Sequence, residues 1–288
     1  MSSTRIADLL SDGMKALKEA GIEAPAREAR LLLGMAARLT PTMMIGFPER
    51  SVDMAAAEAY RALLARRVAR EPVSHLLGVR EFWSRPFFVT RDVLDPRPDS
   101  EALIEAVLDE IHDRQRPLRI VDFGTGSGCL LLTLLAELPA AQGWAVDLSP
   151  AALDVAKKNA AQLGLGARVN WREGSWDAAL AADDPTAFDI IVSNPPYIPA
   201  ADIAALEPEV RLHEPHMALV GGPDGLDAYR ALAPVVAGRL AADGLAALEI
   251  GIGQGESVRS LVLATGLAFA GSSADLAGRE RCLLFRKV

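Results

Sequence analysis

The chain has 288 residues, half of them hydrophobic, and a formal net charge of -8 at pH 7. That length suits one α/β domain with a smaller companion. The acidic balance argues against a general phosphate-binding surface, since affinity for nucleic acid rests largely on lysine and arginine. No apolar run approaches the roughly 20 residues needed to span a bilayer, and residues 1–13 lack the basic and apolar regions of a secretory leader. We therefore expect a cytoplasmic protein that does not enter a membrane.

Residues 1–80 have the pattern of a small helical bundle. Residues 1–90 carry 13 Lys and Arg against 10 Asp and Glu, a mild basic excess that suits an ordinary solvated helix surface. Nothing in this part has catalytic spacing, so we expect it to serve recognition or packing. Apolar side chains recur at intervals of three and four residues in three stretches: Ile6, Leu9, Leu10, Met14 and Leu17; Ala29, Leu32, Leu33 and Ala36; Tyr60, Leu63, Leu64 and Val68.

A short β-hairpin is expected to connect this bundle to the rest of the chain. Aromatic and apolar residues gather over 81–93, and the segment 95–101 leads into a helix of about fifteen residues, with acids that suit plain capping. Arg97 lies between two prolines in a rigid loop, and our hypothesis is that it closes an active site over a bound loop. The predicted domains are a helical domain over residues 1–80, a hairpin connector over 81–98 and an α/β domain over 99–288.

A glycine-rich turn after the first strand of the α/β domain indicates a nucleoside site. Residues 118–123 read as a buried strand, and glycine follows at 124, 126 and 128. A dinucleotide fingerprint would place its third glycine where this chain has Cys129, which argues against a pyrophosphate cradle. The next strand ends at Asp147, where a carboxylate can accept both hydroxyls of a ribose. Together they favour a nucleoside that carries an amino-acid tail.

The remaining strands predict a doubly wound sheet with seven strands. Residues 167–172 read as a strand that precedes Trp176, whose indole suits an adenine ring, although a core tryptophan would give the same pattern. Residues 188–193 form the fourth strand, and three more follow near residues 245–250, 267–270 and 281–285. Because parallel strands bring their carboxyl ends to one edge of a sheet, we expect the ligand site there.

The residues after the fourth strand are Asn194, Pro195, Pro196 and Tyr197. The two prolines lack backbone donors, which leaves the Asn194 side chain and the carbonyl oxygens of Asn194 and Pro195 free to accept hydrogen bonds. A planar NH2 group suits these acceptors, with the Tyr197 ring packed on its face. A simple turn with a buried tyrosine is the alternative for these four residues alone.

Other site classes have weak support. His213 and His216 offer two imidazoles, but no third ligand lies nearby and Pro215 would break the helix that such a pair needs, so we predict no metal. A serine hydrolase lacks its G-x-S-x-G elbow. Cys129 and Cys282 have no CxxC spacing and are expected as reduced core thiols.

Several motifs in order resemble a known family. VDFGTGSG, the acid of AVDLSP, GSW and SNPPYIP resemble the class I S-adenosylmethionine-dependent methyltransferases, and NPPY resembles the subgroup that methylates planar NH2 nitrogens. The flanking segments PVSHLLGVREFW, DVLDPRPDSE, EVRLHEP, ALVGGPDGLDAYR, LEIGIGQGE and DLAGRERCL are similar to the protein-(glutamine-N5) methyltransferases of peptide-chain release factors, the PrmC or HemK family. Two departures are Pro-Asp-Ser-Glu in place of Pro-Glu-Thr-Glu, and Ser175 where an Asp often precedes the Trp.

The resemblance implies a Rossmann-like α/β fold of seven strands and a methyl transfer from S-adenosylmethionine to the glutamine of a Gly-Gly-Gln motif. It implies a monomer that acts on class I release factors. The cofactor's ribose would bind Asp147 and its adenine Trp176, while the substrate amide would meet the NPPY segment, Asn194 to Tyr197, with Asn194 also beside the cofactor. The residues implied for the methionine end are Gly124, Thr125, Gly126, Ser127 and Gly128.

Two other functions remain open from the sequence. An adenine-N6 DNA methyltransferase shares the NPPY logic because adenine also presents a planar NH2 group, and it would flip that base out of the helix. The acidic charge and the lack of a target-recognition domain count against it. A non-catalytic nucleoside-binding module is the second alternative, and the intact NPPY beside an intact glycine loop counts against it.

Overall fold

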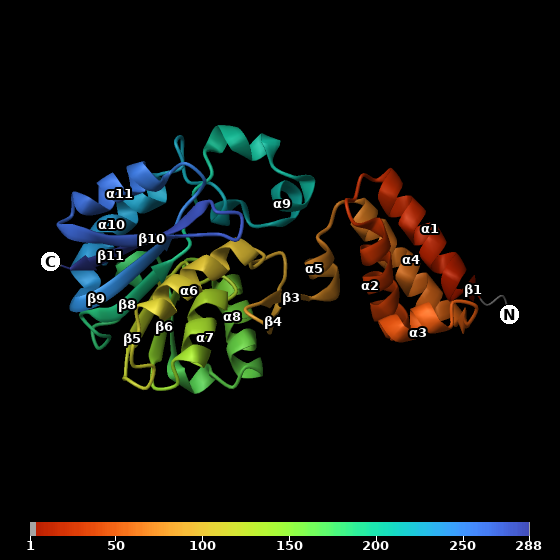
Figure 1. The fold of residues 1–288 in the computed structure, drawn as a ribbon, viewed down its shortest axis with the longest axis horizontal. Coiled ribbons are helices and arrows are strands. Elements are labelled where there is room, and N and C mark those ends of the chain that lie inside the picture. The colour runs from red at the N-terminus through yellow and green to blue at the C-terminus, as the bar shows by residue number, and fades with distance from the viewer. Residues whose placement is uncertain (1–3, 288) are drawn as a thin grey trace. The chain divides into compact units, whose positions relative to one another are not determined.

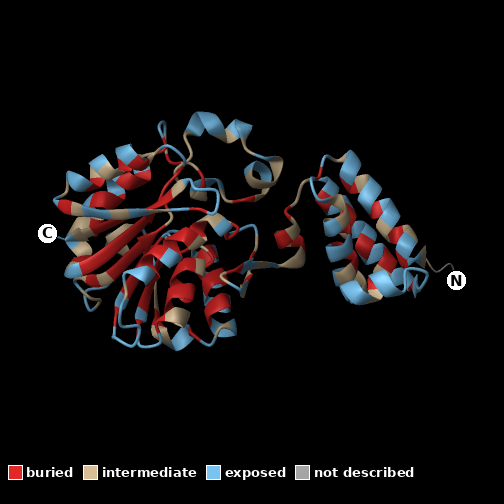
Figure 2. Cartoon of the chain, viewed as in Figure 1, coloured by how far each residue is buried: buried red, intermediate tan, exposed pale blue. Residues whose placement is uncertain are grey.

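The computed structural model describes residues 4–287 of the chain (Figure 1). The chain divides into two compact units, Met1–Val79 with Glu207–His213, and Arg80–Leu206 with Glu214–Val288. Each unit has its own buried core (Figure 2).

The first unit is a helical bundle. Its core is formed largely by the apolar side chains that recur every three or four residues in the sequence. Ile6, Leu32 and Tyr60 among them are fully or almost fully buried. Gly13 lets two helices approach, because a Cβ at this position would collide with the Tyr60 ring and hydroxyl. The elements of this unit are β1 (Thr4–Arg5), α1 (Ile6–Glu19), α2 (Pro25–Ala37), α3 (Pro41–Gly46), β2 (Ser51–Val52), α4 (Met54–Val68), α5 (Val73–Leu77) and α9 (Pro208–His213).

A buried arginine holds α9 in this unit. Arg67 is 5% exposed; its Nε donates to Glu28 at 2.6 Å and its Nη1 to Glu209 at 2.9 Å. Arg70 donates to the other oxygen of Glu209 at 2.8 Å. Since a buried charge needs a partner, the four side chains fix one another. A segment inserted between two strands of the α/β sheet therefore packs with the helical bundle.

The hairpin is formed by β3 (Val79–Phe82) and β4 (Arg85–Phe88). Trp83 and Ser84 connect the strands with φ values of 50° and 56°, so both residues of the two-residue turn are left-handed, as in a type I′ hairpin. Phe82 and Phe87 pack edge to face with ring centroids 6.1 Å apart. The hairpin thus contributes two aromatic side chains to the core beneath the sheet.

The second unit is built on a sheet of seven strands, which confirms the predicted fold class. The strand order is β10-β11-β9-β8-β5-β6-β7. β5 lies between β6 and β8, so that Ile120 opposes both Gly143 and Ile190, and within the described sheet β11 runs in the opposite direction to the other six strands. The strands are β5 (Arg119–Phe123), β6 (Gln142–Asp147), β7 (Val169–Glu173), β8 (Phe188–Ser193), β9 (Leu240–Glu249), β10 (Leu267–Ala274) and β11 (Glu280–Lys287).

Helices cover both faces of this sheet (Figure 1). Alternate residues of β5 show the division: Ile120 packs with α6 (Glu101–Asp109) and α7 (Cys129–Glu137), whereas Val121 packs with α10 (Asp227–Arg239) and α11 (Gly255–Leu263). The helix that begins at Glu101 has nine residues rather than the expected fifteen, and polar residues follow it. The other elements are α8 (Pro150–Gln162) and the 3₁₀ helices η1 (Pro98–Ser100), η2 (Gly166–Arg168), η3 (Trp176–Ala179), η4 (Ala200–Ala205) and η5 (His216–Ala218).

Two consequences for function follow from this fold. β5, β6, β7 and β8 are parallel, so their carboxyl ends share one edge, and the order of connections reverses at β5. Ligands of open α/β sheets bind at such a switch point. Over residues 4–287, none of the helices combines the length and the apolar character that a bilayer crossing requires.

Candidate active site

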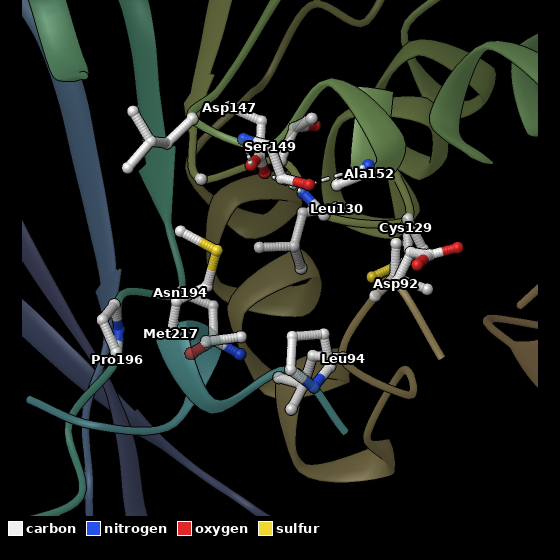
Figure 3. Close-up of a pocket in the computed structure, with 18 of the residues that line it drawn as sticks. Asp92, Leu94, Cys129, Leu130, Asp147, Ser149, Ala152, Asn194, Pro196 and Met217 are labelled. Atoms are coloured by element: carbon white, nitrogen blue, oxygen red, sulfur yellow. Dashed lines mark hydrogen bonds between the residues drawn. The ribbon is translucent and has the colours of Figure 1, made fainter. Parts of the chain in front are cut away.

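A cavity of about 360 Å³ lies within the second unit at this edge of the sheet. Figure 3 shows that its walls come from well-separated segments, with Asp147 and Ser149 on one side and Asn194 and Met217 on another. Most of the residues expected at the site line it: Gly124, Thr125, Gly126, Ser127, Asp147, Trp176, Asn194 and Pro196. Gly128, Pro195 and Tyr197 do not line it.

The glycine loop joins β5 to α7 and adopts a left-handed backbone at every glycine. Gly124, Gly126 and Gly128 have φ values of 79°, 54° and 81°. Gly128 also leaves little room for a side chain, because a Cβ at this position would lie 3.0 Å from Leu132 and 3.2 Å from Ala156. Non-glycine residues rarely adopt this conformation, so the loop depends on glycine. Its first amide donates to the Val146 carbonyl at 2.8 Å and ties the loop to β6.

Asp122 supports the loop from below. This residue is fully buried, and its Oδ2 accepts from the Thr125 hydroxyl at 2.8 Å. Burial raises the pKa of Asp122 to about 7, with a further contribution from the charge of Asp147, while the Thr125 hydrogen bond opposes the shift. The loop is therefore held by a carboxyl that is only partly ionised near neutral pH.

Asp147 ends β6 and faces the loop. Its Oδ2 accepts from the Gly126 amide at 2.8 Å and its Oδ1 from the Ser149 amide at 2.9 Å. Burial raises the pKa of Asp147, and the backbone hydrogen bonds oppose that shift. Each carboxylate oxygen can accept more than one hydrogen bond. Asp147 can therefore bind two neighbouring hydroxyl groups while it keeps the loop in place.

Trp176 lies at the start of η3, beyond the end of β7. Its backbone is left-handed, with φ of 48°, which is rare for a bulky residue. The ring packs edge to face on Phe123, with centroids 6.4 Å apart. One part of Trp176 thus joins the core, and another part lines the cavity.

The NPPY segment begins where β8 ends. Asn194 is half-buried and its Nδ2 lies 3.5 Å from the Ser100 hydroxyl oxygen. The Tyr197 carbonyl oxygen accepts a hydrogen bond from Gln254 Nε2 at 2.9 Å. The Tyr197 ring lies close to Gly251, because a Cβ built on Gly251 would be 3.0 Å from this ring. Burial raises the pKa of Tyr197 to about 12, so its phenol is neutral. The Tyr197 ring packs toward β9 rather than into the cavity wall, and its contact with a planar amide stays a prediction.

Some cavity residues had no recognisable signal in the sequence. Met217 and Pro215 come from the segment around η5, after α9, and Asp92 and Leu94 from the segment that follows the hairpin. Their order and type match no motif of a nucleoside site. A resemblance to the family covered both segments but gave these four residues no role.

Arg97, one of the residues that line the cavity, forms an ion pair with Glu214. Arg97 Nη2 donates to both carboxylate oxygens of Glu214 at 2.7 Å, and the Glu214 side chain is 2% exposed. Burial raises the pKa of Glu214 to about 7, while the Arg97 charge lowers it. Glu214 therefore belongs to an ion pair, and His213 and His216 on either side lie in different units. Residues 4–287 contain no group of three or more His, Cys, Asp or Glu that could hold a metal ion.

Both cysteines are free thiols. Cys282 is fully buried in β11, and Cys129 lines the cavity at the start of α7. Burial raises the pKa of Cys129 to about 12 and raises that of Cys282 further. Neither thiol is a nucleophile near neutral pH, since the thiolate is the reactive form.

Family models and curated proteins match most of this chain. The family model "PrmC N-terminal domain" matches residues 8–78, and the model "Methyltransferase small domain" matches residues 81–206. The chain is 49% identical to the release factor glutamine methyltransferase of Rhodospirillum rubrum, over 97% of this chain and 84% of that protein. It is also 49% identical to the protein of that name from Cereibacter sphaeroides, over 98% of both chains.

Among solved structures, the catalytic domain of hMettl16 in complex with MAT2A 3′UTR hairpin 1 matches with a TM-score of 0.58 and 14% identity, over 89% of this chain and 91% of that chain. At this identity the likeness concerns the fold alone. The high identity over almost the full length of the curated relatives identifies the family: the chain belongs to the release factor glutamine methyltransferases.

Proposed function

We propose that this protein transfers a methyl group from S-adenosylmethionine to the side-chain amide nitrogen of the glutamine in the Gly-Gly-Gln motif of class I release factors. The observation that carries the proposal is the single cavity that joins the glycine loop and Asp147 to Asn194. Membership of the family supports the reaction and its substrate.

The chain's residues fit the cofactor. The loop amides and the two carboxylate oxygens of Asp147 offer hydrogen bonds to a methionine tail and a ribose. Leu130, Ala152 and Trp176 give the cavity an apolar wall for an adenine. When bound, S-adenosylmethionine supplies a methyl group on a sulfonium, which is a strong methyl donor. The protein therefore needs to orient the acceptor nitrogen and exclude water rather than supply a strong base.

Asn194 is proposed to orient that nitrogen. A glutamine amide nitrogen is a poor nucleophile because its lone pair is delocalised into the carbonyl group. When Asn194 Oδ1 accepts a hydrogen bond from one of its N–H groups, it raises the electron density of the nitrogen and fixes its direction. The Pro195 carbonyl oxygen is the second acceptor expected from the sequence, although Pro195 does not line the cavity. The proton leaves during or after the transfer, so no histidine or cysteine base is required. Pro196 lines the cavity beside Asn194 and stiffens this strand end.

The first unit is proposed to recognise the release factor. It contains no residue of the cavity, and it exposes apolar side chains such as Ile45, Phe47 and Met54, at 72%, 55% and 61%. We also propose a cytoplasmic location, since the substrate takes part in translation, and a monomeric state. Sequence-specific binding of nucleic acid is not expected.

The test is methyl transfer from labelled cofactor, measured in parallel on a release factor, on the same factor with its Gly-Gly-Gln glutamine replaced, and on duplex DNA. We expect label on the first substrate alone. Asn194→Ala should slow transfer by about 100- to 1,000-fold and leave cofactor affinity within about tenfold, because one orienting interaction is worth roughly 2.7–4 kcal/mol in the transition state. Asn170→Ala, on β7 and outside the cavity wall, is the matched control.

Label on DNA alone would contradict the proposal and indicate an adenine-N6 DNA methyltransferase. Cofactor binding without transfer to any of the three substrates would favour the non-catalytic module. Wild-type turnover in Asn194→Ala would remove Asn194 from the mechanism.

A further inference from the structure

Glu249 is a buried carboxyl that the proposed methyl transfer does not use. It is the last residue of β9 and is 1% exposed. Its Oε2 has no hydrogen-bond partner among residues 4–287. A buried polar atom without a partner costs free energy, so packing alone does not account for a carboxyl at this position.

The sheet places Glu249 beside Asn194. β8 and β9 are parallel neighbours in which Ser193 opposes Leu248. Asn194 and Glu249 are the next residues on the two strands, so they emerge together at the carboxyl edge. The second neighbour of Asn194 is Ser100, at the end of η1, whose hydroxyl lies 3.5 Å from Asn194 Nδ2. That separation is long for a hydrogen bond, and a carboxylate is the stronger acceptor.

The groups around Glu249 favour its role as an acceptor. Burial is the main influence on Glu249 and raises its pKa to about 7, with a smaller contribution from the charge of Asp99. The neighbouring Ser100 hydroxyl and Asn194 amide, both possible donors to this carboxyl, and the positive charge of Arg281 lower the pKa. The other titratable groups that couple to it are Tyr197, Tyr229, Cys129 and Cys282, and the pKa of each is raised, so all four are neutral near pH 7.

The orientation of the Asn194 carboxamide decides which atom meets the substrate. The two ends of the group have nearly the same shape, so only hydrogen-bond partners distinguish its two orientations. With Nδ2 toward Ser100 and Glu249, the Oδ1 acceptor is directed to the cavity that Asn194 lines. In the reverse orientation Oδ1 would face a carboxylate oxygen, and the cavity would meet a donor that cannot accept an amide N–H.

We propose that Glu249 is a positioning residue that selects the Asn194 orientation with Oδ1 toward the acceptor amide. The inference rests on the proposed function, because it gives Glu249 a role in the same reaction. Ionised Glu249 only accepts hydrogen bonds and therefore enforces this orientation. Protonated Glu249 can donate to Oδ1, so the preference is lost as the pH falls through the pKa, and kcat should decrease toward acid pH.

The experiment compares the full-length wild type with Glu249→Gln, whose amide has the same shape but no charge. The readouts are kcat and KM with a full-length release factor, cofactor affinity by calorimetry, and the pH profile of kcat between pH 6 and 8.5. We expect Glu249→Gln to lower kcat by about 10- to 100-fold, as small errors in positioning do, with KM and cofactor affinity within about threefold. The fall of kcat toward acid pH should disappear in the variant. Glu137→Gln is the matched control, since Glu137 pairs with Arg85 and lies outside the cavity wall.

Each outcome separates this inference from the proposed function. Absence of transfer by the wild type contradicts both, whereas normal transfer by the wild type and by Glu249→Gln contradicts the role of Glu249 alone. The same holds if the acid fall of kcat persists in Glu249→Gln. If that variant does not fold, as judged by circular dichroism and lost cofactor binding, Glu249→Asp keeps the charge but shortens the arm. A lower kcat with unchanged cofactor affinity then supports the proposal, and wild-type kcat overturns it.

Discussion

Arg97 donates from one nitrogen to both carboxylate oxygens of Glu214, at 2.7 Å each, although 117 positions separate the two residues. Arg97 lies just before η1 and Glu214 just after α9. Arg97 itself lines the cavity, and Glu214 directly precedes Pro215, which is another lining residue. The ion pair therefore ties together two segments of the cavity wall that no strand connects.

Arg97→Ala should destabilise the protein by about 1–3 kcal/mol. Removal of one partner from a fully buried pair costs about 3–5 kcal/mol, and Arg97 is one-third exposed, which reduces the cost. Without the arginine charge the pKa of Glu214 should rise further above its usual range. Denaturant unfolding at pH 7 measures the effect.

The control for this prediction is Arg230→Ala, because Arg230 and Asp224 form an ion pair with both side chains about half exposed. That pair should contribute at most about 1 kcal/mol. Equal unfolding free energies for the two variants would show that the Arg97 pair is not effectively buried. Normal stability combined with slower methyl transfer in Arg97→Ala would instead favour a role in closure over the substrate.

Asp147→Asn should weaken cofactor binding and leave the chemical step almost unchanged. The proposed contact is with ribose hydroxyls, remote from the transferred methyl group, so its loss acts on binding. We expect the Kd for S-adenosylmethionine to rise by about 10- to 100-fold, equivalent to about 1.4–2.8 kcal/mol, with kcat at saturation within about threefold. Calorimetry measures the affinity, and Asp154→Asn is the control because Asp154 is exposed on α8. Unchanged affinity would remove the ribose assignment.

Much of the second unit was predictable because a parallel sheet has a clear sequence pattern. Apolar strands such as Ile190–Val192 are buried on both faces, and polar or glycine residues follow where they end. The glycine loop, Asp147, Trp176 and Asn194 all lie at such ends, and the sheet brings them to one cavity.

The rest depends on contacts between residues far apart in sequence. The pairing of Arg67 with Glu209 spans 142 positions, and no periodicity marks either residue. The same holds for Met217, whose place in the cavity wall depends on the path of the chain after α9. Single charged or apolar side chains of this kind have no local signature, so sequence patterns cannot assign their partners.

Asn159→Ala should destabilise the second unit because Asn159 joins three segments. Asn159 is fully buried in α8; its Oδ1 accepts from the Phe88 amide at 2.6 Å, and its Nδ2 donates to the carbonyl oxygens of Phe88 and Ser127 at 3.0 and 2.9 Å. Alanine leaves these backbone groups without partners, at a cost of about 2–4 kcal/mol.

Denaturant unfolding measures this loss, and cofactor affinity should fall with it because Ser127 belongs to the glycine loop. Asn170→Ala is the comparison, since Asn170 makes one hydrogen bond of 3.3 Å to the Gly143 carbonyl oxygen. Its cost should stay below about 1.5 kcal/mol. A similar loss in both variants would contradict the bridging role of Asn159.

Asp122 should make the protein less stable as the pH rises from acid to neutral. Burial raises its pKa from 3.8 to about 7, so the folded state holds a proton that the unfolded state has released. The carboxyl therefore costs no stability below the unfolded pKa. Its cost grows as the pH rises between the two values and is constant above the folded pKa. The cost is on the order of 1–4 kcal/mol, because each pKa unit corresponds to about 1.36 kcal/mol.

Asp122→Asn removes this titration and keeps an oxygen that can accept from Thr125. Melting temperatures of the cofactor-free wild type and variant, measured between pH 4 and 8, should show the variant gaining relative stability up to about pH 7 and no further change above it. Glu214 and Glu249 also have raised pKa values, but they are common to both proteins and cancel in the difference. A difference that is the same at every pH would mean that Asp122 titrates alike in the folded and unfolded states.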